Sequence, residues 1–413
     1  MTCSKIFSGD LPELTYEVIK YFQNDYSTLH SCILVNRLWC RLSIPLLWEN
    51  PFSIYAKNHN YIEIYLLYIN DDLKTTFYKY KVINNSLPSS TLFNYPKFLK
   101  YLNTYEFIFS VRKWFGSPIK YINLESISYL TDFYIMIDIC VSLFKIFIEN
   151  EVNLHTLEID STSIIYDSIY PSNILELILQ NTNFIHNIKN LKFHIIDNNR
   201  NIALIKDRIS QIINLQQNLK QILINRSGFL LCQSLFLSKD YNCSNTLNTI
   251  VFYYCDFKES KSVYQMFNLM ENIKQNLNYL LIDISEYTTI SPIISTSSII
   301  LQNLGQVLPS KLEYVRLALN IKESDFRLFL ENSQDIFINK LFIKQSGSDD
   351  ILHYIKEYIM KERRVRYLAI NIENRIDLFD WKDEVKEFKL YNIIVRSCND
   401  LYIYVDNYIK NID

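Results

Sequence analysis

The chain has 413 residues, of which 49% are apolar and 21% charged, and its formal net charge is −2. This length allows one small module plus a larger one, or a repeat array, and the apolar share excludes bulk disorder. Only five glycines are present, which argues against glycine-rich phosphate loops and dinucleotide-binding folds. The near-zero net charge gives no broad electrostatic surface for nucleic acids or anionic lipids.

The eight cysteines include no Cys-x-x-Cys pair, and a chain of this length does not need disulfides to fold. We therefore expect reduced thiols and a cytoplasmic or nuclear location. The first residues, MTCSKIFSGDLPEL, lack the apolar core of a secretion signal. The longest apolar stretch, 133–148, contains Asp138 and Lys145 and is too short to span a bilayer, so we expect no membrane partner.

Residues 10–52 predict three short helices, because apolar residues recur there at three- and four-residue spacing. Pro12 suits the first turn of the first helix. The residues expected to cap the three helices are Asp10, then Ser27 or Thr28, then Asn36, and Pro45 is expected to end the third. Three helices of this size bury little apolar area by themselves. A partner protein is expected to cover the surplus apolar residues, which are Leu11, Trp39, Leu46, Leu47 and Trp48.

Four short motifs in this segment resemble the F-box in both order and spacing. They are Leu11-Pro12, Val18-Ile19, Leu34-Val35-Asn36-Arg37-Leu38-Trp39 and Pro45-Leu46-Leu47-Trp48. The resemblance implies a three-helix module that docks on the small adaptor subunit of a cullin–RING ubiquitin ligase. The adaptor contacts that it implies fall on Leu11, Pro12, Ile19, Leu34, Val35, Trp39, Leu46 and Trp48. For each of these residues, the alternative is a place in the core of the module itself.

The rest of the chain carries a repeated pattern, apolar-x-x-apolar-x-apolar. Its copies start at residues 154, 188, 219, 247, 277, 312, 338, 365 and 388, and a weaker copy, IKYINL, starts at 119. The mean spacing is about 29 residues, a period typical of repeat architectures. The end of each copy predicts a short strand whose alternate residues point inward.

Stretches with helical apolar spacing lie between these strands and start near residues 174, 202, 262 and 349. A strand followed by a helix, repeated at this period, predicts an α/β solenoid with a curved parallel sheet inside and helices outside. The copies resemble degenerate leucine-rich repeats, although the Asn or Cys expected after each strand is mostly absent. Asn225 and Cys255 are candidate remnants of that position. The alternative is an ordinary α/β domain with buried parallel strands.

The predicted organisation therefore has three parts. Residues 8–52 form the F-box-like module, residues 53–118 a helical linker packed on the first repeats, and residues 119–413 the leucine-rich-repeat-like solenoid. The C-terminal stretch from Asn399 is expected to cap the last repeat.

The sequence shows no arrangement of residues that predicts catalysis. It contains no Gly-x-Ser-x-Gly and no His-Glu-x-x-His motif, and its six histidines are scattered. Cys232, Cys243 and Cys255 lack a histidine partner in zinc-finger register and are expected to be buried thiols. We therefore predict no catalytic residue, no metal, no cofactor and no enzymatic activity of the chain itself.

In a leucine-rich solenoid, the residues between the inward positions face the concave side. In the middle repeats they are apolar and have polar or charged neighbours on both sides, which is the composition of a protein interface. The residues predicted to bind a target protein are Leu223, Val251, Tyr253, Leu281, Arg316 and Lys344. The alternative is that loops or the C-terminal segment cover this face.

These features predict a substrate-recognition subunit of an SCF-type cullin–RING E3 ubiquitin ligase, acting in ubiquitin-dependent protein degradation. The F-box-like module would bind the adaptor, and the repeats would hold a target protein near the ubiquitin-charged enzyme, which is catalysis by proximity. The expected partners are the adaptor, the ligase that it belongs to and a target protein, with no nucleic acid. The alternative is a repeat scaffold that uses the F-box for assembly without ubiquitination.

Overall fold

The fold is that of a computed structural model of the chain. It describes residues 11–23, 25–53, 59–71, 74–75, 77, 91–119, 129–160, 169–195, 202–226, 243, 245–255, 257, 260–284, 290–346, 349–372 and 376–403. The chain divides into two compact units. The first comprises Met1–Ser163 and Asp167–Asn187, and the second comprises Ile164–Tyr166 and Ile188–Asp413. Within the described part of the chain, no helix has the length and apolar character needed to cross a bilayer.

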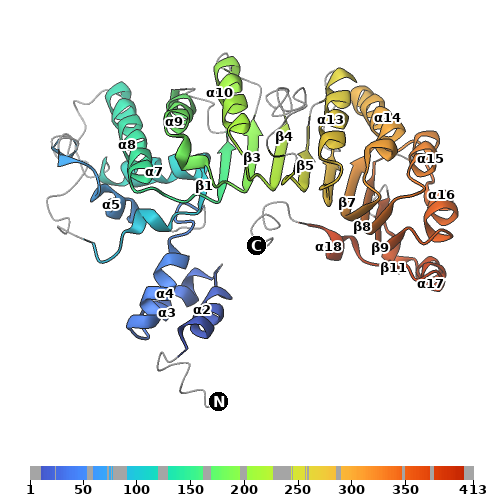
Figure 1. Cartoon of the computed structure of the whole chain (residues 1–413), viewed down its shortest axis with the longest axis horizontal. Helices are drawn as coiled ribbons and strands as arrows, with labels where there is room; N and C mark the ends of the chain where they lie inside the picture. The colour runs from blue at the N-terminus through green and yellow to red at the C-terminus, as the bar shows by residue number, and fades with distance from the viewer. Residues whose placement is uncertain are drawn as a thin grey trace. The chain divides into compact units, whose positions relative to one another are not determined.

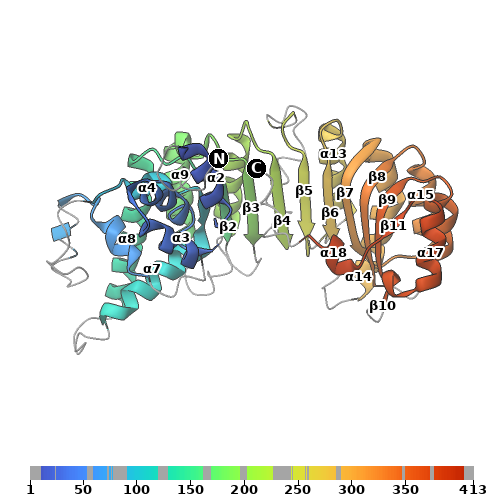
Figure 2. The same cartoon turned by 90° about the horizontal axis from the view of Figure 1, so that it is seen from below.

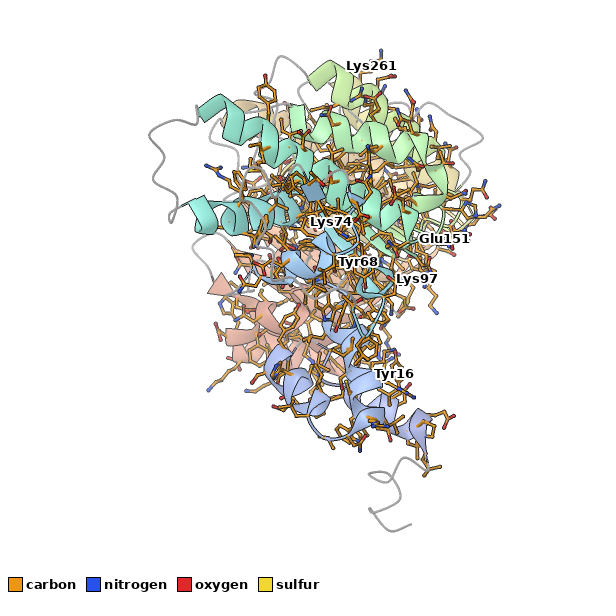
Figure 3. All side chains as sticks on the ribbon, turned by 90° about the vertical axis from the view of Figure 1, so that its left-hand side faces the viewer. Tyr16, Tyr68, Lys74, Lys97, Glu151 and Lys261 are labelled. Atoms are coloured by element: carbon orange, nitrogen blue, oxygen red, sulfur yellow. The ribbon has the colours of Figure 1, made fainter. Side chains whose placement is uncertain are left out.

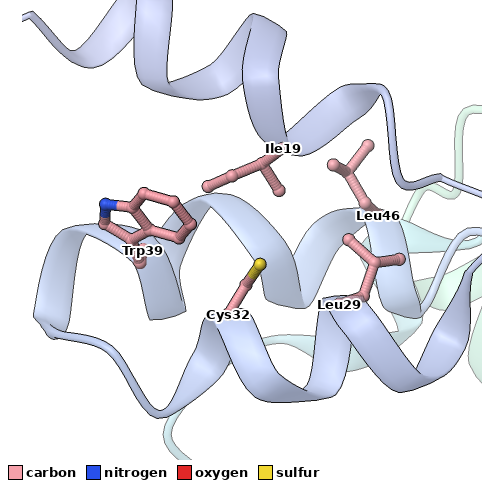
Figure 4. Packing of buried hydrophobic residues seen from close by; sticks show 5 residues of the cluster. All are labelled: Ile19, Leu29, Cys32, Trp39 and Leu46. Atoms are coloured by element: carbon pink, nitrogen blue, oxygen red, sulfur yellow. The ribbon is translucent and has the colours of Figure 1, made fainter. Parts of the chain in front are cut away.

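Three helices begin the first unit, as predicted: α2 (Pro12–Lys20), α3 (Tyr26–Ile33) and α4 (Arg37–Leu47) (Figure 1). We call residues 11–53 the docking module, after the adaptor docking that the sequence predicts for them. Helix α4 packs against both α2 and α3. Each helix contributes to one buried cluster, which consists of Ile19, Leu29, Cys32, Trp39 and Leu46 (Figure 4). Burial of each large apolar side chain contributes roughly 1.5–3 kcal/mol, so this cluster provides the main stabilisation of the module.

The helix boundaries confirm one predicted cap and correct two other details. Asn36 caps α4, because its side chain accepts a hydrogen bond from the backbone N–H of Trp39 at 3.0 Å. Asp25, rather than Ser27 or Thr28, caps α3 and accepts from the N–H of Thr28 at 3.0 Å. Pro45 lies inside α4 instead of ending it. It sits in the last turn, where a missing N–H removes a single backbone bond. The predicted cap Asp10 lies outside the described residues.

The remainder of the first unit is mixed α and β. Its elements are α5 (Tyr61–Leu66), the 3₁₀ helix η1 (Tyr95–Phe98), β1 (Tyr101–Asn103), α7 (Thr104–Ile119), α8 (Tyr129–Glu149), β2 (Thr156–Asp160), α9 (Ile169–Gln180) and the 3₁₀ helix η3 (Thr182–Ile185). Strands β1 and β2 pair in parallel, with Tyr101 opposite Thr156. Tyr68, labelled in Figure 3, follows α5 and donates its hydroxyl hydrogen to the carbonyl of Phe93 at 2.7 Å.

The segment predicted as a helical linker, residues 53–118, is not helical throughout. Its helices are present, but β1 is a strand that pairs with the strand of the first strong repeat copy. The weaker copy at 119 does not begin as a strand, since Ile119 is the last residue of α7. Residues 120–128 lie outside the described residues.

The second unit is built around one sheet. Its strands are β3 (Asn190–Ile195), β4 (Gln221–Arg226), β5 (Thr249–Tyr253), β6 (Tyr279–Asp283), β7 (Lys311–Leu319), β8 (Phe337–Gln345), β9 (Val365–Ile372), β10 (Ile376–Asp377) and β11 (Ile394–Val395). From β3 to β9, each strand pairs in parallel with the next one in the chain. Strand β9 also pairs with β11 in parallel and with β10 in antiparallel orientation.

Helices join these strands, as the sequence predicted. They are α10 (Ile202–Asn214), α13 (Ser260–Ile273), α14 (Ile290–Val307), α15 (Glu323–Asn332), α16 (Leu352–Tyr354) with the π-helical turn η4 (Ile355–Met360), the 3₁₀ helix η5 (Leu378–Asp380) and α17 (Lys382–Leu390). A last helix, α18 (Cys398–Leu401), follows β11. Helices α10, α13 and α14 lie on one side of the sheet (Figure 1). The α/β class is thus confirmed, and the parallel order of consecutive strands is compatible with a curved α/β solenoid.

Eight of the nine strong copies of the repeat pattern contain strands, from β2 to β9. The copy at 388 is wrong as a strand, because Phe388 and Leu390 belong to the end of α17. Asn392 then adopts a left-handed backbone with φ 63°, which is a common way to end a helix. The N–H of Ile393 bonds back to the carbonyl of Phe388 at 3.1 Å, and the strand β11 begins only after this turn.

One of the five glycines permits a close approach between helices. A Cβ atom on Gly305 of α14 would lie 2.9 Å from the Cβ of Asn332 and 2.9 Å from the carbonyl oxygen of Phe329, both in α15. Backbone atoms cannot move aside as a flexible side chain can. The contact between α14 and α15 therefore requires glycine at this position.

We expect Gly305→Ala to lower the free energy of unfolding by roughly 1–3 kcal/mol, the usual cost of overpacking. The direction of the change in unfolding free energy is informative, because replacing glycine by alanine at an unobstructed helix position stabilises a protein by about 1 kcal/mol. Gln306→Ala on the same helix, where the side chain is exposed, is the matched control and should change stability little. Urea unfolding followed by circular dichroism measures both variants.

Candidate functional site

The docking module buries half of the residues predicted to contact an adaptor. The side chains of Ile19, Trp39, Leu46 and Trp48 are at most 8% exposed. The first three form the core of the module, so the alternative interpretation holds for them. The other predicted residues are accessible: Pro12, Leu34 and Val35 are exposed, and Leu11 is half-buried.

The expectation that Trp48 needs a partner protein to cover it is wrong. Its ring lies 5.3 Å from that of Tyr65 in an edge-to-face contact and 4.3 Å from that of Tyr95. Phe52 continues this aromatic packing, with its ring 5.1 Å from that of Phe107 in α7. Aromatic pairs of this kind each contribute about 0.5–1.5 kcal/mol beyond the burial of their area. The apolar end of the docking module is thus covered by the chain's own next elements.

Apolar side chains nevertheless remain exposed on the docking module. Leu34 is 76% and Val35 is 53% exposed, where α3 ends and the turn to α4 begins. On α2, one apolar stripe also faces outward, formed by Leu14, Val18 and Tyr21. These five residues are the exposed apolar set, from which we leave out Tyr26, 38% exposed, because its hydroxyl is bonded to the carbonyl of Asn50 and lies 3.2 Å from the hydroxyl of Ser53. Leu34 and Val35 were predicted as adaptor contacts. The three residues of the α2 stripe were not predicted to be exposed.

The helical spacing of α2 fits two faces, and the sequence alone does not choose between them. Leu14 and Val18 are four residues apart, but so are Thr15 and Ile19, and these latter two are the buried ones. Thr15 is tolerated in the core because its hydroxyl donates to the carbonyl of Leu11 at 3.0 Å. A threonine in a helix can bond its hydroxyl to the carbonyl four residues earlier and so be buried. Thr15 was therefore the signal in the sequence that could have identified the buried face of α2.

Glu49 fixes the end of the docking module to the strand that follows. Its carboxylate accepts hydrogen bonds from Lys100 and, at 2.8 Å, from the side-chain amide of Gln23. Its backbone carbonyl accepts from the N–H groups of Lys100 and Tyr101, both at 3.0 Å. Burial raises the pKa of Glu49, although the charge and hydrogen bond of Lys100 act in the opposite direction. The module is thus held to β1 by side-chain and backbone bonds together.

The second predicted surface lies on the sheet of the second unit, on the face opposite the long helices. The strand register places six residues in one row across β4 to β9: Leu223, Val251, Leu281, Arg316, Phe342 and Ala369. The two other residues predicted to bind a target, Tyr253 and Lys344, lie in the next row on the same face. The sequence therefore predicted correctly which residues share this face.

The C-terminal segment packs on this face, which is the alternative that the sequence left open. Leu223, Val251, Leu281 and Arg316 are each at most 2% exposed, while Tyr253 and Lys344 are half-buried. Helix α18 lies on the side of the sheet away from α13 and α14 (Figures 1 and 2). We call Leu401–Ile403, the end of α18 and the two residues after it, the C-terminal strap. Residues 404–413 lie outside the described residues.

The C-terminal strap contacts the face through all three of its residues. Leu401 packs with Phe342 and Ala369. Ile403 packs against a cluster of buried residues, which are Leu223, Val251, Leu281 and Tyr314. The ring of Tyr402 lies 4.4 Å from the guanidinium carbon of Arg316. The hydroxyl of Tyr314 donates to the carbonyl of Leu401 at 3.0 Å, so a buried polar atom on each side is satisfied.

A buried ion pair stands in the middle of this face. A guanidinium nitrogen of Arg316 lies 2.6 Å from a carboxylate oxygen of Asp283, and both side chains are only 2% exposed. Burial by itself lowers the pKa of Arg316, but the charge of Asp283 and the neighbouring tyrosine hydroxyls together raise it above its usual value. The guanidinium is therefore charged, and it lies against the rings of Tyr402 and Phe342, which also contact each other edge to face. Such a position favours contact with aromatic groups.

The cysteines suggested for the repeat region behave as buried thiols where they are described. Cys243 and Cys255 are free and almost fully buried. The thiol of Cys243 donates to the carbonyl of Gln216 at 3.1 Å, and that of Cys255 to the carbonyl of Ile224 at 3.2 Å. Cys232 lies outside the described residues.

Comparisons of the chain with protein-family models, with curated proteins and with solved structures found no match.

We expect removal of one member of the buried ion pair to be strongly destabilising. Asp283→Ala leaves Arg316 charged and unpaired, which costs about 3–5 kcal/mol. The double variant Asp283→Leu with Arg316→Met should regain most of that loss, because apolar residues of similar volume often replace a buried pair without cost. Urea unfolding of the single and double variants gives the comparison, and equal stabilities of the two would contradict it.

The raised pKa of Glu49 gives a second prediction. Because burial disfavours its ionised form, its favourable contribution to stability is present below its usual pKa of 4.5 and is lost as the pH rises through the raised value. We expect Glu49→Gln to be at least as stable as the wild type at pH 7, because the amide keeps an acceptor for Gln23 and Lys100 and avoids the cost of burying a charge. Glu49→Ala should be less stable than both, since Gln23 and Lys100 then lose an acceptor. Thermal melts between pH 4 and pH 8 test the order of the three proteins.

Proposed function

We propose that the chain is the substrate-recognition subunit of an SCF-type cullin–RING E3 ubiquitin ligase, acting in the cytoplasm or the nucleus. The docking module binds the adaptor, and the repeat-like second unit binds a target protein. The chain itself contributes no catalytic residue and needs no cofactor. It acts by raising the local concentration of the target beside the ubiquitin-charged enzyme.

One observation supports adaptor binding above the others. The docking module closes its own core with five side chains and still exposes Leu34, Val35 and an apolar stripe on α2. Scattered exposed apolar residues are ordinary on protein surfaces, but five on a module of about 40 residues favour a protein partner. The F-box-like motifs in the same segment indicate which partner this is.

The attachment of the docking module also suits this role. A proximity mechanism needs the adaptor-binding part and the rest of the receptor to be held in a fixed geometry. Glu49 and the aromatic packing of Trp48 hold the module to the other elements of the first unit. Adaptor binding would then position that whole unit and not only its three N-terminal helices.

The proposal that the repeats are leucine-rich-repeat-like is supported by Cys255. It follows β5 by two residues, where such repeats carry an Asn or a Cys. Its thiol donates to the carbonyl of Ile224 in the neighbouring strand β4, so it links one repeat to the preceding one. Asn225, the other candidate remnant, is instead bonded to the side chain of His194 at 2.9 Å.

Adaptor binding is tested by changing the exposed residues, because the buried ones also support the fold. We expect the double variant Leu34→Asp with Val35→Asp to bind the purified adaptor subunit at least tenfold more weakly than the wild type. Both side chains are exposed, so the thermal melt should be nearly unchanged. Leu328→Asp, an exposed leucine on α15, is the matched control and should bind the adaptor normally.

A wild-type chain that does not bind the adaptor would overturn the proposal, as would a double variant that binds it fully. Trp39→Ala is unsuitable for this test, because loss of a core tryptophan is expected to cost about 3–5 kcal/mol and to unfold the module. If the chain binds the adaptor but its bound proteins do not accumulate when the proteasome is inhibited, an assembly scaffold is the better description.

A further inference from the structure

The face of the sheet that carries the Asp283–Arg316 pair is occupied by a segment of the same chain. The two clusters to which the C-terminal strap contributes extend over strands β4 to β9. Every residue of the strap contacts this face. The aliphatic side chains of Leu401 and Ile403 pack on apolar clusters, and the ring of Tyr402 lies on a guanidinium. The carbonyl of Leu401 accepts a hydrogen bond from a tyrosine hydroxyl. The face therefore has the features needed to bind a short peptide.

These contacts do not depend on where the segment comes from. The backbone N–H and C=O groups of a strand inside a sheet bond to neighbouring strands, and the faces present only side chains. The strap is accordingly held by side-chain packing and by the hydroxyl of Tyr314. A segment of another protein with an aromatic side chain between aliphatic ones can make the same set of contacts.

The firm attachment of the chain ends just before the strap. The N–H of Arg396 bonds to the carbonyl of Leu368 at 2.9 Å, and the N–H of Cys398 bonds to the carboxylate of Asp377 at 2.7 Å. The strap's own backbone is held by the last turn of α18, through the N–H of Leu401 to the carbonyl of Ser397 at 3.3 Å and that of Tyr402 to the carbonyl of Cys398 at 2.8 Å. Opening this one turn lifts the strap while α17 and β11 stay in place. A short tether of this kind keeps the strap at an effective concentration on the order of millimolar near the face. A free peptide must therefore be present at a higher concentration, or bind more tightly, to displace the strap.

We propose that this face of the sheet is a peptide-binding surface of the chain, with Leu401–Ile403 as its tethered occupant. The partner is an extended segment of a target protein that presents an aromatic residue flanked by aliphatic ones, and it binds by displacing the strap. The aromatic ring stacks on Arg316, and the preceding carbonyl accepts from Tyr314. The inference depends on the proposed function only where it identifies the competing segment as part of a target.

The test uses the full chain and a synthetic peptide with the sequence of residues 399–403, Asn-Asp-Leu-Tyr-Ile, labelled with fluorescein. The release variant, Tyr402→Ala with Ile403→Asp, removes two of the strap's three side-chain contacts, those with Arg316 and with the Leu223–Tyr314 cluster, and leaves every residue of the face unchanged. Asn399→Ala, at an exposed position in α18, is the matched control. We expect the release variant to bind the peptide at least tenfold more tightly than the wild type or the control, as measured by fluorescence anisotropy.

Two further measurements make the result specific. A peptide in which alanine replaces the tyrosine should bind the release variant at least fivefold more weakly. In the wild type, an excess of the peptide should speed hydrogen exchange at the amides of residues 401–403, because displacement of the strap opens the last turn of α18, in which Leu401 and Tyr402 are bonded. The second measurement does not depend on whether the release variant folds.

Equal peptide affinities of the wild type and the release variant would overturn the proposal, and so would the absence of measurable binding to either. Unchanged exchange at residues 401–403 under excess peptide would also count against it. Adaptor binding is measured on the same proteins as a separate readout. If the wild type does not bind the adaptor, the proposed ligase function is refuted. The peptide experiments would still decide the role of the strap.

Discussion

A parallel sheet with apolar residues on both of its faces cannot leave either face open to water, and the second unit depends on this constraint. In the central part of the sheet, every second residue points towards the helices and is buried, as Ile222, Ile250 and Leu280 show. The intervening row, from Leu223 to Ala369, points the other way and is apolar except for Arg316. The helices cover the first face, and the last described residues of the chain contribute to covering the second.

This arrangement explains why an ion pair is retained in the middle of an apolar row. Arg316 is charged, paired with Asp283 and placed against two aromatic rings, so it fits a neighbour that brings an aromatic side chain. The C-terminal strap brings Tyr402. The same constraint acts in the docking module, where a small core is closed by Trp39 and the surplus aromatic surface of Trp48 is covered by Tyr65 and Tyr95. In both units, apolar surface is covered first by the chain itself.

Much of the fold could be predicted because its signals are local and repeated. Eight strands followed from one six-residue pattern, since alternation along a strand leaves a period of two in the sequence. The pattern failed at Phe388, where the end of a helix and its left-handed turn produce the same spacing of apolar residues. It also missed β1, which has only three residues and is defined by its pairing with β2 rather than by its own composition. The N-cap of α4 was predicted correctly as Asn36. The N-cap of α3 is Asp25 and not Ser27, because the carboxylate of Asp25 comes earlier in the chain and is a stronger acceptor.

By itself, the sequence determined the α/β class, the helical docking module and the set of residues that share the second face of the sheet. These features depend on neighbours within a few residues of each other, or on a repeated register. The tertiary structure alone decided which of those residues are exposed. Ile19 is buried while Val18 is exposed, and Leu223 lies under a segment that contains Ile403, about 180 residues later in the chain. Exposure is a property of the packed molecule, since a side chain is buried by whatever part of the chain reaches it, and no local pattern records that contact.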